Sequence, residues 1–130
     1  TYVAQLERID VDMVAYQDEV GVRKAKPTET GAYFEALRRA HDRAGRSALW
    51  ADVELFDFEG EPYRSALIPA DMDRVIKQLE SFSPYVDTVL GYQYIGLMNR
   101  PGTKAFCGHP DSIQFYEDYR KRKGGQVDFT

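Results

Sequence analysis

A strict alternation of apolar and polar positions marks the stretch from residue 48 to residue 58. One set is Leu49, Ala51, Val53 and Leu55, and the other is Trp50, Asp52 and Glu54. This alternation predicts a β-strand at 48–55 whose apolar set faces a core. The second set is unusual because an aromatic ring and two carboxylates share one face. If that face borders an enclosed site, these side chains carry the chemistry; if it meets bulk water, they form a solvated edge.

Two more strands are predicted on either side of this one. Residues 9–18 carry apolar residues on both faces in the middle, as in a strand buried on both sides. Residues 86–98 form the third strand, and residues 126–129 could begin a fourth. Longer loops are expected after the strands, at 57–69 and 99–109, because both stretches contain glycine and proline.

Three helices follow the three strands. The first is capped by Thr28 or Thr30, ends at Gly45, and carries an apolar stripe at Tyr33, Leu37, Ala40 and Ala44. His41 lies among charged residues of this helix, and we expect it to be solvated. The second helix is capped by Asp71 and presents Met72, Val75, Ile76, Leu79 and Phe82 to the core. The third has Pro110 in its first turn and ends in the basic run 120–123.

The repeating unit is therefore a strand, a long loop, a helix and a short return. Alternating strands and helices predict a parallel sheet with right-handed crossovers, and the long loops gather where α/β proteins place their sites. A complete (β/α)8 barrel needs about 250 residues, and this chain has 130. The polar face of the central strand suits a barrel interior better than an open sheet covered on both faces. We predict one α/β domain over residues 1–130, with three strand–helix units resembling half of a TIM barrel.

Composition narrows the class of protein. The chain is 43% hydrophobic and 29% charged, as in ordinary soluble domains. A net charge of −4 argues against nucleic-acid binding. No apolar run approaches the roughly 18 residues of a membrane span, and neither a signal peptide nor an initiating Met is present. One cysteine, Cys107, excludes an internal disulfide framework. The chain has nine Tyr and seven Phe, several of them in predicted loops, and exposed aromatic rings suit stacking on carbohydrate. Loops rich in Tyr are, however, also found as ordinary amphipathic surface.

Several short motifs together resemble the domain-of-unknown-function 4434 family, specifically its C-terminal half. They are Gln17-Asp18 with Val20-Gly21, the segment Trp50 to Phe56, Gln78-Leu79, Tyr92-Gln93-Tyr94, Leu97-Met98, and Phe115-Tyr116 with Tyr119. The resemblance implies bacterial, mostly secreted, periplasmic or cell-envelope proteins with a glycoside-hydrolase-like TIM barrel. It therefore implies a carbohydrate ligand and requires no cofactor. One departure is Gln93, where the family pattern leads us to expect a carboxylate on the third strand; a glutamine cannot act as nucleophile or general acid.

Within that resemblance, Glu54 and Asp18 are the predicted catalytic pair. Both lie at or near the C-terminal ends of adjacent strands, and glycoside hydrolysis needs two carboxyl groups about 5–5.5 Å or 6.5–9.5 Å apart. Trp50 would raise the pKa of Glu54 toward general-acid use. The structural alternative is that Glu54 pairs with an arginine and Asp18 caps a turn. Glu19 competes with Asp18 and is not separable from it by sequence.

The remaining candidates would bind substrate. They are Gln17, Trp50, Asp52, Tyr92, Gln93, Tyr94 and His109. Tyr92 and Tyr94 are predicted to share one face as stacking platforms, and Asp52 to orient Glu54. The structural alternative for His109 is that it caps the third helix. A divalent cation is a second alternative, with candidate ligands Asp18, Glu19, Asp52, Glu54 and His109. No close ligand spacing supports such a metal site, and we predict none.

The sequence thus predicts a glycoside-hydrolase-like domain that acts on an extracellular or envelope polysaccharide. The alternative is a non-catalytic carbohydrate-binding or structural fragment of a TIM barrel. Half a barrel exposes strand edges, which favour association. We therefore expect either a homo-oligomer or an N-terminal half that completes the barrel.

Overall fold

The computed structural model of the chain describes residues 1–100 and 109–123, so the possible strand at 126–129 and Cys107 lie outside the described residues. Its elements, in order, are α1 (Tyr2–Arg8), β1 (Met13–Gln17), α2 (Thr30–Ala44), β2 (Ala48–Glu54), β3 (Phe56–Phe58), β4 (Leu67–Pro69), α3 (Met72–Phe82), the 3₁₀ turn η1 (Ser83–Tyr85), β5 (Thr88–Tyr92) and α4 (Ser112–Lys123). Among the described residues, no helix is both long and apolar enough to span a bilayer.

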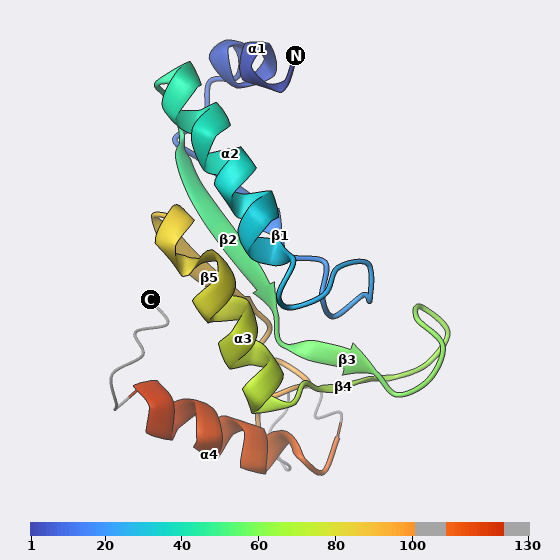
Figure 1. Cartoon of the computed structure of the whole chain (residues 1–130). Coiled ribbons are helices and arrows are strands. Elements are labelled where there is room, and N and C mark those ends of the chain that lie inside the picture. The colour runs from blue at the N-terminus through green and yellow to red at the C-terminus, as the bar shows by residue number, and fades with distance from the viewer. Residues whose placement is uncertain (101–108, 124–130) are drawn as a thin grey trace.

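Three parallel strands form the main sheet, in the order β1-β2-β5. The register places Gln17 beside Asp52 and Glu54 beside Tyr92. Helices α2 and α3 lie together on one face of this sheet (Figure 1). The predicted parallel α/β arrangement of strand–helix units is therefore confirmed.

The core lies between the sheet and these two helices and continues into the β3–β4 pair and α4 through Phe56, Phe58 and Phe115. Leu49, Ala51 and Val53 of β2 are at most 2% exposed, as their alternation predicted. The Phe34 and Phe82 rings of α2 and α3 meet at a centroid distance of 4.9 Å and are fully buried. Helix α3 begins at Asp71, whose side chain accepts a 2.8 Å hydrogen bond from the Asp73 amide, so its predicted cap is confirmed.

The predictions for α2 were partly wrong. The N-cap is Glu29, while the Thr30 hydroxyl donates instead to the Pro27 carbonyl. The buried residues of α2 are Thr30, Phe34, Leu37 and His41, so Leu37 was predicted correctly, while Phe34 and His41 are buried in place of their neighbours Tyr33 and Ala40. His41 is only 2% exposed because its ring nitrogens bond the Ser47 carbonyl and the Tyr16 hydroxyl. Gly45 does end the helix, at φ 69°.

The outer strands are shorter than predicted. Strand β1 covers only Met13–Gln17, and alternate residues along it are exposed, so it is not buried on both sides. Strand β5 ends at Tyr92 rather than continuing to residue 98. The sheet face opposite the helices keeps side chains such as Met13 and Leu90 more than 40% exposed. Within the described residues, one face of the sheet is thus packed and the other is open.

Two elements were missed in the sequence. Helix α1 lies beside α2, with Leu6 buried against it (Figure 1). The predicted loop 57–69 holds the antiparallel pair β3–β4, which projects from the end of β2. The alternation Phe56-Asp57-Phe58, with Gly60 and Pro62 after it, is typical of a hairpin.

Gly31 provides a test of the packing between α2 and α3. A Cβ at this position would lie 2.7 Å from the Ser81 carbonyl oxygen. Gly31→Ala should lower the free energy of unfolding by about 1–3 kcal/mol, although alanine favours a helix by about 1 kcal/mol. Gly60→Ala is the control, since its Cβ would lie 3.4 Å from Ser65. Equal urea stability of the Gly31 variant and wild type would contradict this packing.

Candidate functional site

An open cleft lies at the C-terminal ends of β1, β2 and β5, on the sheet face that the helices leave open. Its lining residues come from the strand ends, the segment after β1 and the β3–β4 hairpin: Gln17, Glu19, Val22, Lys24, Glu54, Phe56, Phe58, Tyr63, Leu67 and Tyr92. Three sequence candidates, Gln17, Glu54 and Tyr92, therefore meet here. Parallel α/β proteins place their sites at this end of the sheet.

Glu54 forms part of the cleft floor and is only 1% exposed. The backbone at Gly21 and Val22 packs against it, and the Val22 amide donates a 2.9 Å hydrogen bond to Glu54 Oε2. A Cβ on Gly21 would lie 2.9 Å from Glu54 Cβ and 2.7 Å from the Phe56 carbonyl oxygen, so only glycine allows this approach. Burial, followed by the nearby charges of Asp18 and Glu19, raises the pKa of Glu54.

Asp18 does not line the cleft, which departs from the predicted pairing with Glu54. It is 1% exposed, and its Oδ1 accepts 3.3 Å hydrogen bonds from the amides of Val20 and Glu54. Its Oδ2 accepts from the amide group of Gln78 on α3. Burial raises the pKa of Asp18 despite these donors. Its contacts tie the end of β1 to the end of β2 and to α3.

Arg74 of α3 extends this network around the end of β2. Its guanidinium donates to the carbonyls of Glu54 and Phe56 at 2.7 and 2.8 Å, and to Gln78 Oε1 at 3.0 Å. Burial lowers the pKa of Arg74, although the neighbouring Asp57 and Asp18 oppose the shift. The network therefore fixes where Glu54 enters the cleft. Gln78 belonged to the sequence motifs, but Arg74 had no signal beyond its place in a helix.

Glu19 and Lys24 stand at the rim of the cleft, where their side chains form an ion pair of 3.3 Å. Glu19 is the carboxylate that the sequence could not separate from Asp18. The structure separates them, because Glu19 lines the cleft and Asp18 is buried outside it. The pKa of Lys24 is raised by its hydrogen bond and its attraction to Glu19.

Arg23 joins the segment after β1 to the hairpin. Its guanidinium donates to Asp57 Oδ1 at 3.0 Å, to the Gly60 carbonyl at 3.1 Å and to the Phe58 carbonyl. Glu19, Arg23 and Tyr63 all have φ between 62° and 64°. Such left-handed backbone is unfavourable for these residue types and gathers at functional sites. The two segments that build the cleft, the one after β1 and the hairpin, thus share this strain, which also occurs at Ser47, directly before β2.

One wall of the cleft is aromatic. The ring of Tyr92 packs edge-on against Phe56 at 6.0 Å, Phe56 against Phe58 at 5.8 Å, and Phe58 against Tyr63 at 5.3 Å. The two phenylalanines are buried, whereas Tyr92 and Tyr63 are 40% and 68% exposed. Each exposed ring thus rests on a buried one. The hairpin rings were not among the sequence candidates, because this stretch was predicted as a loop.

The remaining candidates lie elsewhere. Trp50 and Asp52 are half-buried on the same sheet face, further from the strand ends. Gln93 and His109 line a different cavity, and His109 Nδ1 accepts from the Asp111 amide before α4. The alternative that His109 caps the third helix therefore agrees with its contacts.

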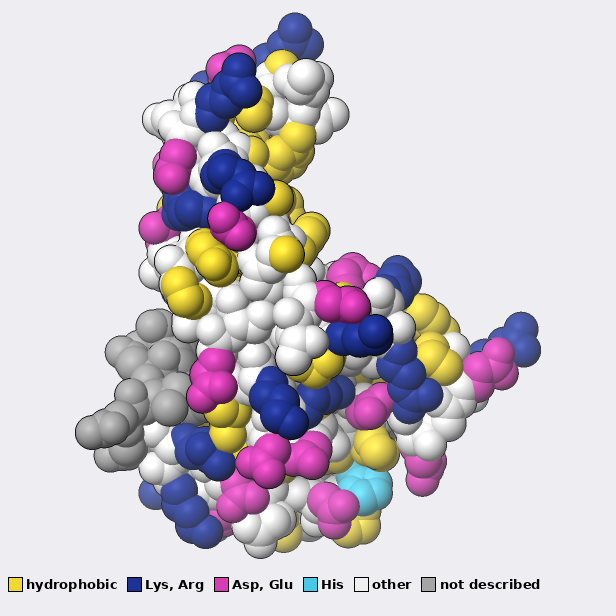
Figure 2. All heavy atoms as spheres, in the orientation of Figure 1, with side chains coloured by type: hydrophobic (Ala, Val, Ile, Leu, Met, Phe, Trp, Pro, Cys, Tyr) yellow, Lys and Arg dark blue, Asp and Glu magenta, His cyan; other side chains and the backbone are white. Residues whose placement is uncertain are grey.

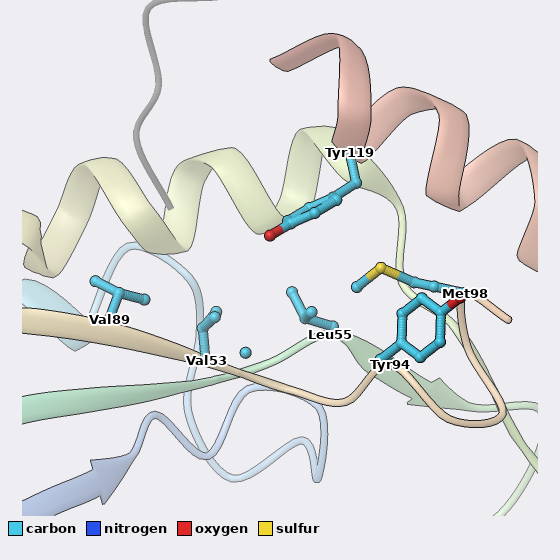
Figure 3. A pocket seen from close by; sticks show the side chains of 7 residues that line it. Val53, Leu55, Val89, Tyr94, Met98 and Tyr119 are labelled. Carbon is cyan, nitrogen blue, oxygen red and sulfur yellow. The ribbon is translucent and has the colours of Figure 1, made fainter. Parts of the chain in front are cut away.

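The prediction that Tyr92 and Tyr94 share one face does not hold, because β5 ends at Tyr92, before Tyr94. Its ring lies in an apolar cavity with Met98 and Tyr119 (Figure 3). That cavity includes Val53 and Leu55, which belong to the helix-facing set of the central strand. Tyr94 is thus on the other side of the sheet from Glu54.

Charged side chains of both signs are interspersed over the face seen in Figure 2, without a large patch of one sign. Many are paired, for example Arg38 with Asp42 at 3.0 Å and Arg39 with Glu35 at 2.8 Å. In the described part of the chain, no three His, Cys, Asp or Glu side chains are placed to hold a metal ion.

A family model described as a domain of unknown function, DUF4434, matches residues 1–105. The chain belongs to this family. A solved structure described as a "putative alpha-L-fucosidase from Bacteroides thetaiotaomicron" is similar to this DUF4434 chain, with a TM-score of 0.67 and 20% sequence identity. The match covers 92% of this chain and 33% of that one, so the DUF4434 chain spans about a third of its length. At this identity the likeness concerns the fold. No curated protein matches the sequence.

The Asp18 network can be tested through Gln78, which is fully buried. Gln78→Leu removes the donor to Asp18 and the acceptor of Arg74, leaving buried polar groups without a partner. We expect urea unfolding to show a loss of about 1–3 kcal/mol or more. Gln114→Leu is the matched control, because its bond to Asp118 is exposed and its loss should cost less than about 0.5 kcal/mol. Equal losses would argue against a special role for the buried network.

The raised pKa values of Glu54, Asp18 and Asp52 predict a pH dependence of folding. The native state holds these protons more tightly than the unfolded chain, so stability falls as the pH rises from about 4 through the raised values. Glu54→Gln should make this fall shallower. The pKa of Asp87 is lowered, chiefly by the Leu49 amide, so Asp87 contributes stability that is lost as the pH falls below about 4, and Asp87→Asn should reduce the loss of stability on that acid side. Urea midpoints across pH test both signs, and unchanged slopes would contradict them.

Proposed function

We propose that this DUF4434 chain contributes part of a closed (β/α) barrel, with residues 1–130 as one domain. Three observations support this. The sheet is parallel, its helices cover one face, and β1 and β5 each have one neighbour in the order β1-β2-β5. In such a barrel, Trp50, Asp52 and Glu54 would face the interior. Further strands from a longer protein, or a second copy of the chain, would complete the barrel by pairing with the two outer strands.

We further propose that the cleft is the site of a glycoside hydrolase acting on an extracellular or cell-envelope polysaccharide. The observation that carries this proposal is the buried carboxyl of Glu54 in the floor of an aromatic-lined cleft at the strand ends. A raised pKa keeps such a carboxyl protonated to higher pH, as a general acid requires. The fold of the fucosidase-like structure is consistent with this class of enzyme.

In this proposal, Glu54 protonates the glycosidic oxygen of the leaving group. The second carboxylate is Glu19, which lines the same cleft, whereas Asp18 is a positioning residue that binds the Glu54 amide. Gln17 and Tyr92 line the cleft on either side of β2 and would orient the sugar. Substrate would have to reach Glu54 past the segment at Gly21 and Val22, which packs against it.

Glu54→Gln tests the proposal. On an alkyl glycoside or polysaccharide that the wild type hydrolyses, the variant should lose about 10²–10⁴-fold in rate. The loss should be smaller on the p-nitrophenyl glycoside of the same sugar, because that leaving group needs little protonation. Glu61→Gln removes an exposed carboxylate of the hairpin, whose ion-pair partner is Arg64, and should keep wild-type activity.

Glu19→Gln should also lower activity on both substrates, since it removes the second carboxylate rather than the acid. If Glu54→Gln retained full activity, the assignment of the acid would be wrong. If no glycoside were hydrolysed by the wild type but sugar binding persisted, the chain would be a carbohydrate-binding module.

A further inference from the structure

Tyr63 stands at the tip of the β3–β4 hairpin and lines the cleft at a distance from Glu54 along the aromatic wall. We propose that it forms a second saccharide subsite, so that the cleft binds an oligosaccharide rather than one terminal sugar. This inference rests on the proposed carbohydrate function and deepens it, because it names the length of the ligand and a residue that selects it.

The exposure of Tyr63 has no structural explanation in the fold. Among the described large hydrophobic side chains it is the most exposed, at 68%. Its backbone holds φ at 64°, a conformation that glycine or asparagine would adopt with less strain. An aromatic residue kept exposed on strained backbone is typical of a binding position rather than of packing.

The ring is nevertheless supported from beneath. It packs on Phe58 at a tilted angle of 55°, and Phe58 itself is only 6% exposed. Arg23 donates to the Phe58 and Gly60 carbonyls, and Ser65 accepts from the Gly60 amide at 2.8 Å. These contacts hold the tip in place before a ligand arrives, which reduces the entropy lost on binding.

Two exposed tyrosines thus stand along one cleft, with the buried rings of Phe56 and Phe58 between them. Tyr92 lies at the end of β5 beside Glu54 in the register. In this series of ring contacts Phe56 and Phe58 separate the two tyrosines, and the proposed ligand spans both, as an oligosaccharide longer than a single sugar would. The hydrophobic face of each sugar ring would lie on an exposed aromatic ring.

Polar groups suited to sugar hydroxyls accompany the distal ring. The Lys24 ammonium lies within the influence of both Glu19 and Tyr63, each of which raises its pKa. An ammonium donates to a hydroxyl oxygen, and a carboxylate accepts from a hydroxyl. The Lys24 ammonium can therefore donate to a hydroxyl of the sugar whose apolar face lies on Tyr63.

The test uses the full chain and two ladders of probes, neutral glucan oligomers and galacturonan oligomers, each from the monosaccharide to the hexasaccharide. Dissociation constants from titration calorimetry should fall with chain length in at least one ladder. Tyr63→Ala should abolish the gain from the longer oligomers, about tenfold, while the affinity for the monosaccharide stays the same. Tyr63→Phe should keep the gain.

Tyr63→Leu keeps an apolar side chain on Phe58 but removes the ring, so it should behave like Tyr63→Ala if the fold is intact. Tyr94→Ala, another half-exposed tyrosine outside the cleft, is the matched control. Length dependence that survives both Tyr63→Ala and Tyr63→Leu, or equal weakening of short and long ligands, overturns the subsite but leaves the proposed function. A wild type that binds neither ladder contradicts the proposed carbohydrate function itself.

Discussion

The arrangement of β1, β2 and α3 depends on the hydrogen bonds that the buried side chain of Asp18 accepts. A charged group taken out of water is costly unless donors surround it. Here the donors come from three places: the turn after β1, the end of β2 and helix α3. The hydrogen bonds of this one side chain therefore form only when the turn after β1, the end of β2 and helix α3 are correctly placed relative to one another. The same contact reaches the amide of Glu54, so the position of the cleft floor follows from the way the sheet is tied to its helix.

The polar residues near Asp18 lie on both faces of the sheet. On the helix side, Gln78 and Arg74 donate to the carbonyl of Glu54 at the end of β2, and Arg74 also donates to that of Phe56 at the start of β3. On the open side, Glu54 and Glu19 border a cleft walled by aromatic rings. Alternation along a strand makes this division possible, because neighbouring residues face opposite sides of the sheet. Asp18 and Glu54, which lie at the ends of neighbouring strands, thus have different surroundings: donors from β2 and α3 enclose Asp18, and Glu54 borders the cleft.

The sequence predicted the elements with the clearest periodicity. The alternation of β2, the stripe and cap of α3, the parallel order of strands and helices and the family all follow from pattern. What it missed depends on tertiary contacts. The burial of His41 needs Tyr16 and Ser47 as partners, and the separation of Asp18 from Glu19 needs a left-handed residue at Glu19. Tyr94 was misplaced because no local signal marks the end of β5 at Tyr92. The aromatic rings of the hairpin were not predicted to line a site, because Gly60 and Pro62 are typical of a loop and the paired strands around them are only three residues long.

The tip of the hairpin, residues 59–66, contributes no residue to the buried core. The hairpin tip is held through Arg23 and through its own turn, and the residues by which the hairpin joins the buried core, Phe56 and Phe58, precede the tip. The tip can therefore change in length and composition with little effect on the core. If the hairpin contacts the ligand as proposed, substitutions in residues 59–66 would change which ligand binds while the core residues stay the same.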